Sequence, residues 1–119
     1  MEKIEQIKTP DIHSQQLLQI IDNVKWEEME ELEYNGTNFL LFFPDETAES
    51  DGHQDAVYHQ STVADFDIYI LSTLPVQEKK RCLFHEIVEA DLRKQGFGNK
   101  EAHSIVEKEE QKIFGNRQK

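Results

Sequence analysis

The sequence has too few of the residues that a disulfide scaffold or a membrane helix would need. Cys82 is the only cysteine in 119 residues, so the chain can form neither an internal disulfide framework nor a zinc site of several thiolates. The longest apolar run, residues 39–43, is ended by Pro44 and is far shorter than the roughly 20 residues of a membrane-spanning helix. The first eight residues, MEKIEQIK, contain no apolar signal core. We therefore expect a cytoplasmic protein without a membrane anchor.

Positive charge is also scarce. Thirteen lysines and arginines stand against 24 aspartates and glutamates, which gives a formal net charge of -11. This charge repels phosphate groups and argues against nucleic acid and anionic membranes as partners. The expected partners are a cation, a peptide or protein substrate, or a basic protein. Nothing in the sequence predicts the oligomeric state.

The order of the hydrophobic patterns predicts an α+β fold. We expect an N-terminal helix, a small antiparallel meander and then a two-helix C-terminal hairpin. At this length the chain fits a single domain over residues 1–119, with a frayed tail from about residue 115. The strand order in the meander is left open.

The N-terminal half carries signals for one helix and a hairpin. Thr9-Pro10 is typical of a helix start, and apolar residues then recur at helical spacing, which predicts a helix over residues 10–24. The next segment, KWEEMEELEYNG, fits either a solvated helix or a strand. Its Asn35-Gly36 pair is a strong hairpin signal, so we favour a strand that ends at Tyr34 and a return strand over residues 37–43.

The remaining elements are predicted by turn residues and by alternation. Residues 44–55 are expected to form an acidic loop. One strand is expected to begin near residue 56, and a second to span residues 66–70. A helix over residues 76–95 ends where Gly96 provides a left-handed cap. Asn99 is the expected N-cap of a last helix to about residue 114. The short link makes these two helices antiparallel neighbours.

The helix over residues 76–95 contains the segment His85-Glu-Ile-Val-Glu89, which differs from the zinc motif H-E-x-x-H only in its last residue. His85 and Glu89 are four residues apart, so they project from one helix face and can share an ion. Glu86 points about 100 degrees away, where a general base can reach a metal-bound water. Zinc accepts a carboxylate oxygen or an imidazole nitrogen at about 2.0–2.2 Å. The alternative is an ordinary His–Glu helix contact in a glutamate-rich chain.

His103 in the last helix is the candidate third ligand. Glu89 lies about seven residues before Gly96 and His103 about seven after it, so the two can face each other across the hairpin. Glu101 and Glu107 are the fallback donors. The competing interpretation of His103 is a histidine packed at the helix interface.

The run DIYILSTLPVQEKKRCLFHEIVEA, residues 67–90, resembles the strand, link and active helix of minimal zincin-type metallopeptidases. These include ImmA/IrrE-like domains and small phage-associated H-E-x-x-H proteins. The resemblance implies that His85 is the first histidine ligand, that Glu86 is the catalytic glutamate and that a following helix supplies the third ligand. Glu89 stands where the family has its second histidine. The usual downstream acidic ligand is matched only loosely, in the region of residues 101–107.

Three other side chains carry groups that can take part in chemistry. His53 and His59 lie in or beside the acidic loop, and we expect them to be solvated. Cys82 lies one turn before His85 and allows a Cys–His pair, although a buried, inert thiol is the favoured interpretation.

Two functional hypotheses follow. The first is a peptidase-like hydrolase of the zincin type, which binds zinc or another divalent ion such as manganese or iron through His85, Glu89 and His103, with Glu86 as the general base. An anionic ligand in place of an imidazole lowers the net charge of the ion, so weak or specialised activity is expected. The second is a non-catalytic interaction module that keeps the zincin-like scaffold and binds a partner through its acidic surface.

Overall fold

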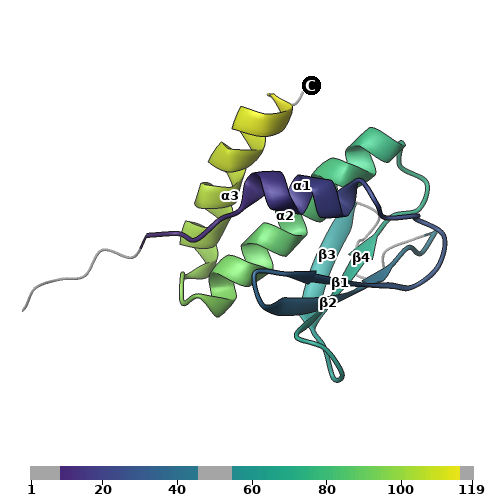
Figure 1. Ribbon diagram of the computed structural model, residues 1–119, viewed down its shortest axis with the longest axis horizontal. Coiled ribbons are helices and arrows are strands. Elements are labelled where there is room, and N and C mark those ends of the chain that lie inside the picture. The colour runs from purple at the N-terminus through teal and green to yellow at the C-terminus, as the bar shows by residue number, and fades with distance from the viewer. Residues whose placement is uncertain (1–8, 46–54, 116–119) are drawn as a thin grey trace, which may run out of the picture.

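A computed structural model describes residues 9–45 and 55–115. In chain order the elements are α1 (Ser14–Ile21), β1 (Glu30–Tyr34), β2 (Thr37–Phe42), β3 (Ala56–Gln60), β4 (Phe66–Ile70), α2 (Val76–Lys94) and α3 (Asn99–Phe114) (Figure 1). The predicted α+β class is confirmed, with one N-terminal helix, a sheet and a C-terminal helical pair. Most of the predicted acidic loop and the tail beyond residue 115 lie outside the described residues.

The four strands form one mixed sheet in the order β1-β2-β4-β3. β1 pairs with β2 and β3 pairs with β4 in antiparallel fashion, whereas β2 and β4 are parallel. The sheet departs from the expected antiparallel meander at this central pair. The chain crosses from β2 to the far edge, forms β3 there, and then returns through β4 into the middle of the sheet.

The β1–β2 hairpin turns at the predicted residues. Asn35 and Gly36 have φ angles of 53° and 77°, so both occupy the left-handed region that a two-residue hairpin turn of the primed type requires. The register pairs Tyr34 with Thr37 directly beside the turn. The ambiguous segment before the turn is therefore a strand, and its acidic side chains Glu31 and Glu33 alternate with the buried Leu32 and Tyr34.

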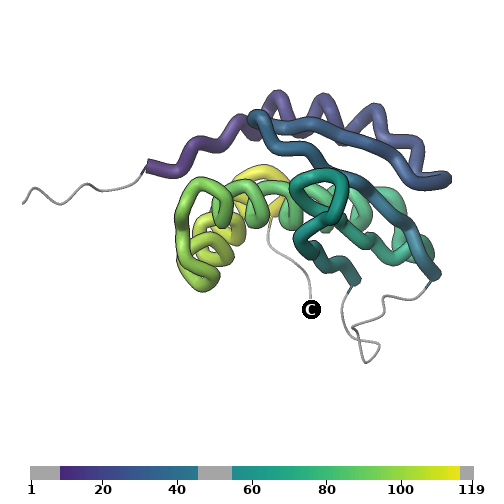
Figure 2. Tube along the Cα trace, turned by 90° about the horizontal axis from the view of Figure 1, so that it is seen from below, coloured from purple at the N-terminus to yellow at the C-terminus, as the bar shows by residue number. Residues whose placement is uncertain are grey.

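One hydrophobic core joins the inner face of the sheet to the helices. Its fully buried large side chains are Leu17, Ile21, Tyr34, Phe39, Leu41, Ile68, Ile70, Leu83, Phe84, Ile87, Val88 and Leu92. α2 packs against β3, β4, α1 and α3, so it is the central element of the fold. In Figure 2 the tube of α1 lies along the upper edge, and the tubes of α2 and α3 lie below it.

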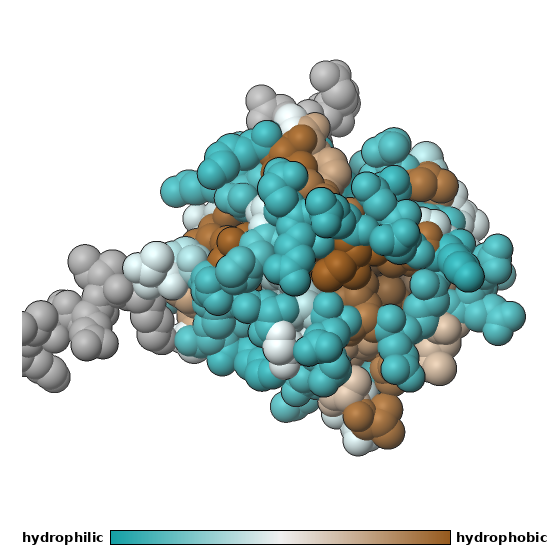
Figure 3. Space-filling view, viewed as in Figure 1, coloured by the Kyte–Doolittle hydropathy of each residue, from teal (hydrophilic) through white to brown (hydrophobic). Residues whose placement is uncertain are grey.

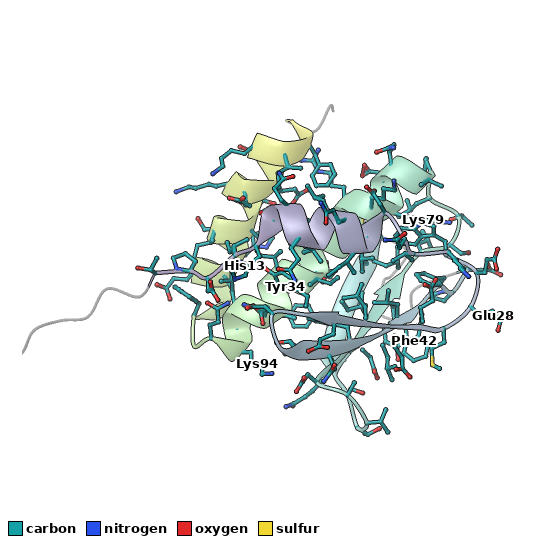
Figure 4. The ribbon with its side chains drawn as sticks, in the orientation of Figure 1. His13, Glu28, Tyr34, Phe42, Lys79 and Lys94 are labelled. Atoms are coloured by element: carbon teal, nitrogen blue, oxygen red, sulfur yellow. The ribbon has the colours of Figure 1, made fainter. Side chains whose placement is uncertain are left out.

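The first helix is shorter than predicted. The proposed start at Thr9-Pro10 and end at Val24 were wrong, because α1 spans only Ser14–Ile21. Tertiary contacts hold the preceding segment in a non-helical conformation: the backbone N–H of Asp11 donates to Gln95 Oε1 at 3.0 Å, and that of His13 donates to Tyr34 Oη at 2.9 Å. Figure 4 shows His13 and Tyr34 close together at this end of α1.

The link between α2 and α3 forms a helix C-terminal motif. Gly96 has a φ of 105°, which is the positive value that the predicted left-handed cap requires. The N–H of Gly96 donates to the Arg93 carbonyl and the N–H of Phe97 donates to the Leu92 carbonyl, which satisfies two orphan carbonyls of α2.

The start of α3 differs from the prediction by one residue. Asn99 is the first helical residue and Gly98 is the N-cap. The backbone N–H of Gly98 donates to Glu101 Oε1 at 3.1 Å. Glu101, a fallback metal donor in the sequence analysis, therefore has a capping role at this position.

The face in Figure 3 is largely hydrophilic, with hydrophobic atoms visible between the polar side chains near its middle. Within residues 9–45 and 55–115, no helix has both the length and the apolar character needed to cross a membrane.

Candidate metal site

The candidate site lies between α2 and α3, where two successive turns of α2 present His85 and Glu89. The Nε2 atom of His85 is 2.9 Å from Glu89 Oε1. Both side chains are largely buried, with 14% and 11% of their surfaces exposed. The hydrophobic residues Phe84, Ile87 and Val88 face the core and fix the rotation of the helix, which turns His85 and Glu89 toward α3.

α3 brings His103 to the same place. Its Nδ1 atom lies 3.4 Å from Glu89 Oε1, and its ring centroid is 5.1 Å from that of His85. His85, Glu89 and His103 each offer one ligand atom, and these atoms all lie within 4.8 Å of one another. The structure thus brings together the three side chains that the sequence analysis singled out.

The spacing of these donors can be compared with the demands of a cation. Four ligands placed tetrahedrally about 2.1 Å from zinc are about 3.4 Å from one another. The Glu89–His103 separation of 3.4 Å matches this value, and the His85–Glu89 separation of 2.9 Å must widen slightly. His103 is about half exposed and so has room to adjust its ring. Two imidazoles and one carboxylate are a donor set that zinc, manganese or iron accepts.

A second group of possible ligands shares His85. His85, Glu107 and Glu110 also offer atoms within 4.8 Å of one another. Glu110 Oε1 lies 2.7 Å from His85 Nδ1, on the opposite side of the ring from Glu89. Its other oxygen, Oε2, accepts a hydrogen bond from Arg81 Nε. Glu107, the other fallback donor, lies 3.5 Å from His103 Nε2 and is half exposed.

The pKa values of the residues in this cluster depend on the hydrogen bonds between them. Burial by itself lowers the pKa of His85, but hydrogen bonds to Glu110 and Glu89 outweigh it and raise the pKa to about 10. Burial likewise opposes ionisation of Glu110, yet hydrogen bonds from His85 and Arg81 lower its pKa to about 2. Without a cation, the imidazolium of His85 is the positive charge between two carboxylates.

Glu86 lies beside this cluster on the adjoining face of α2. It lines a cleft of about 210 Å³ together with His85, Glu107, Glu110 and the start of β3. Burial raises the pKa of Glu86 to about 7. A carboxyl group with such a pKa, next to the candidate ligand His85 and open to a cleft, has the properties of a general acid–base residue.

The other candidates are elsewhere or in other roles. His53 lies outside the described residues. His59 is on β3, where its ring is 6.0 Å from the ring of Tyr69, and it belongs to neither ligand group found in the described part of the chain. Cys82 is buried and lines the cleft, which agrees with the expected buried thiol.

Sequence reasoning missed Arg81 and Glu110. Both are nearly inaccessible, at 8% and 2% exposure. A signal for Glu110 was present, because it continues the stripe of Ala102 and Val106 at four-residue spacing and so falls on the buried side of α3. Arg81 precedes His85 by four residues and shares its face of α2.

Comparison with known proteins adds no relative: no protein-family model, curated protein or solved structure gives a significant match to this chain.

Proposed function

We propose that this protein binds one divalent cation through His85, Glu89 and His103 and acts as a zincin-like hydrolase of peptide bonds. The proposal rests on three donor atoms that come from two helices and lie within 4.8 Å of one another. Zinc is the favoured ion because it binds imidazole and carboxylate together, and manganese or iron is the alternative. A bound cation would supply Lewis acidity and lower the pKa of a coordinated water.

Glu86 is the proposed general base. It is adjacent to His85 in sequence and turned about 100 degrees from it around the helix. Glu86 and His85 both line the cleft of about 210 Å³, whereas Glu89 and His103 line a neighbouring pocket, so His85 connects the two. From the cleft, the carboxylate of Glu86 can accept a proton from the water that attacks a substrate carbonyl and later return that proton to the leaving amine. Glu89 in place of an imidazole adds negative charge to the ligand set, which is expected to weaken the Lewis acid and to slow hydrolysis.

The surroundings of the cleft favour neutral or basic substrates. Glu86, Glu107, Glu110 and Asp55 all line it, and the chain carries a net charge of -11. An acidic peptide would be repelled at this entrance, whereas a peptide with lysine or arginine near the scissile bond would be attracted. We place the protein in the cytoplasm, because its single, buried cysteine needs no oxidising compartment.

The first experiment measures metal content. Protein purified without added metal, and again after incubation with Zn²⁺ and desalting, should contain about one equivalent of metal by mass spectrometry. His103→Ala removes a half-exposed ligand and is expected to lose metal while it stays folded, and Glu89→Ala should also lose metal. His59→Ala is the matched control, because it removes a histidine that lies outside the ligand group.

The second experiment separates binding from chemistry. Glu86→Gln should retain the metal and lose hydrolysis of a fluorogenic peptide library, because the amide cannot accept the proton. Equal activity in Glu86→Gln would remove Glu86 from its role. A parent protein that takes up no metal at any Zn²⁺, Mn²⁺ or Fe²⁺ concentration tested would refute the metal site.

The alternative function is an acidic interaction module. The specific observation in its favour is that His85 has a carboxylate at each ring nitrogen and so has hydrogen-bond partners without a cation. The exposed side chains Glu31 and Glu33 on the edge strand β1 provide an acidic stripe for a basic partner. This alternative predicts salt-sensitive binding of a lysine-rich peptide that is lost in Glu31→Lys/Glu33→Lys, together with an absence of metal.

A further inference from the structure

The two groups of possible ligands share one histidine, His85. Glu89 lies at Nε2 of His85 and Glu110 lies at Nδ1, at 2.9 Å and 2.7 Å. A neutral imidazole carries one proton, so only one of these nitrogens can bind a cation at a time while the other donates a hydrogen bond. The side on which the proton stays therefore decides which group of ligands forms the site.

Arg81 opposes binding of a cation at Nδ1 of His85. Its guanidinium donates to Glu110 Oε2, while Glu110 Oε1 faces His85, so both carboxylate oxygens are already engaged. A cation placed among His85, Glu107 and Glu110 would lie close to this buried positive charge and would be repelled by it. The aromatic ring of Phe114 lies 5.7 Å from the guanidinium carbon and helps to hold Arg81 in place.

On the other side, the cationic residue that lines the pocket of Glu89 and His103 is Lys100, which is exposed, whereas Arg81 is buried. Glu89 Oε1 is approached by the two imidazoles of His85 and His103, and either ring can lose its proton to make room for a metal. Glu110 Oε1 lies 2.7 Å from Nδ1 of His85, where it can accept a hydrogen bond from the Nδ1–H. An imidazole that donates to a carboxylate in this way is fixed in orientation and is a more basic ligand.

Building on the proposed metal site, we propose that Arg81 and Glu110 form a positioning pair that keeps the proton of His85 on Nδ1 and so directs the cation to Nε2, Glu89 and His103. Glu110 does not touch the cation; it acts through His85. Arg81 acts one step further away, by donating to Glu110 Oε2 and so keeping Glu110 Oε1 turned toward the ring. The second group, with Glu107 and Glu110, is then not a metal site.

The first test is a competitive titration of Zn²⁺ against a chromophoric chelator. Glu110→Gln retains the shape of the side chain and should weaken binding about 10- to 100-fold, which is the usual effect of removing such a partner. Glu109→Gln is the matched control: it removes one charge from the neighbouring position, where the side chain contacts Ser14 and not His85. Its affinity should stay within about twofold of the parent. Glu107→Gln should have a smaller effect than Glu110→Gln, because Glu107 is half exposed and lies 3.5 Å from His103 Nε2. Parent-like affinity in Glu89→Gln together with a large loss in Glu107→Gln would place the cation in the second group and overturn the proposal.

The second test needs no variant and so does not depend on folding of Glu110→Gln. Long-range ¹H–¹⁵N correlation spectra of the Zn²⁺-loaded protein identify which nitrogen of each histidine carries a proton. The expected result is a protonated Nδ1 and a metal-bound Nε2 at His85. A metal-bound Nδ1 would overturn the positioning role while leaving the metal site intact, whereas a parent that binds no Zn²⁺ at all would refute the proposed function and, with it, this inference.

Discussion

Removal of the Arg81 side chain should expose how much the buried ion pair contributes to folding. Arg81 and Glu110 are 8% and 2% exposed, so Arg81→Met leaves the carboxylate of Glu110 inside the protein without its guanidinium partner. Breaking a buried pair in this way usually costs about 3–5 kcal/mol. Glu110 keeps the imidazole of His85 at 2.7 Å, so we expect a value near the lower end. A loss of about 3 kcal/mol lowers the folding equilibrium constant roughly 150-fold.

The assay is urea denaturation of the metal-free protein, followed by circular dichroism in the presence of a chelator. With a slope of about 1–3 kcal/mol/M, the midpoint should fall by about 1–3 M urea. Lys80→Met is the matched control, because Lys80 is the neighbouring residue on α2 and pairs with Asp22 at the surface, 3.0 Å away. Such a surface pair contributes about 0–1 kcal/mol.

A double variant tests the reasoning behind this number. Arg81→Met/Glu110→Gln removes both charges, so it should be more stable than Arg81→Met alone, since the main cost is the charge left buried. Two results would refute the argument: an Arg81→Met variant within about 1 kcal/mol of the parent, or a double variant whose loss equals the sum of the two single losses.

Three further predictions concern other contacts. Asp91 accepts hydrogen bonds from Thr37 Oγ1 at 2.7 Å and from two side-chain amides, and Asp91→Ala should lower the free energy of unfolding by about 2–3 kcal/mol in urea titrations, because it leaves the buried Thr37 hydroxyl without this acceptor. Burial raises the pKa of Tyr34 to about 12, whereas an unfolded tyrosine ionises near pH 10. The contribution of neutral Tyr34 to the free energy of unfolding is therefore complete below about pH 10 and is lost as the pH rises toward 12. Urea midpoints should therefore fall more steeply over that range in the parent than in Tyr34→Phe, and parallel curves would contradict this. Glu89→His places a neutral ligand at the proposed metal site, so pH–rate profiles of the metal-loaded variant should show hydrolysis setting in at lower pH than in the parent.

The sequence predicts the local parts of the fold better than the non-local parts. The β1–β2 turn and the end of α2 depend on Asn35, Gly36 and Gly96, whose positive φ angles are properties of a few adjacent residues. The start of α1 depends instead on contacts with Tyr34 and Gln95, which are distant in the chain and override the Thr-Pro signal. The parallel pairing of β2 with β4 is likewise a product of the crossover to β3, and no local pattern specifies it.

The candidate site shows the same division. His85 and Glu89 could be paired from helical spacing alone, and His103 could be added by counting residues across the hairpin, because the short link fixes how the helices face each other. Arg81 and Glu110 could not be paired in this way. Helical spacing places Glu110 on the buried stripe of Ala102 and Val106, but only the packing of α3 on α2 shows that its partner is a buried arginine, Arg81.

The depth of this ionic cluster bears on which function the molecule serves. An acidic binding surface needs its charges in water, and Glu31 and Glu33 on β1 already meet that need. Charges between packed helices are costly, because apolar residues of similar volume usually stabilise a fold as well or better. The cluster around His85 is therefore poorly explained as a contribution to stability or as a docking surface. A bound cation would explain why these charges lie between the helices: His85 and Glu89 would supply ligand atoms, and Glu110 and Arg81 would orient the imidazole. For this reason we favour the proposed metal site over the interaction module.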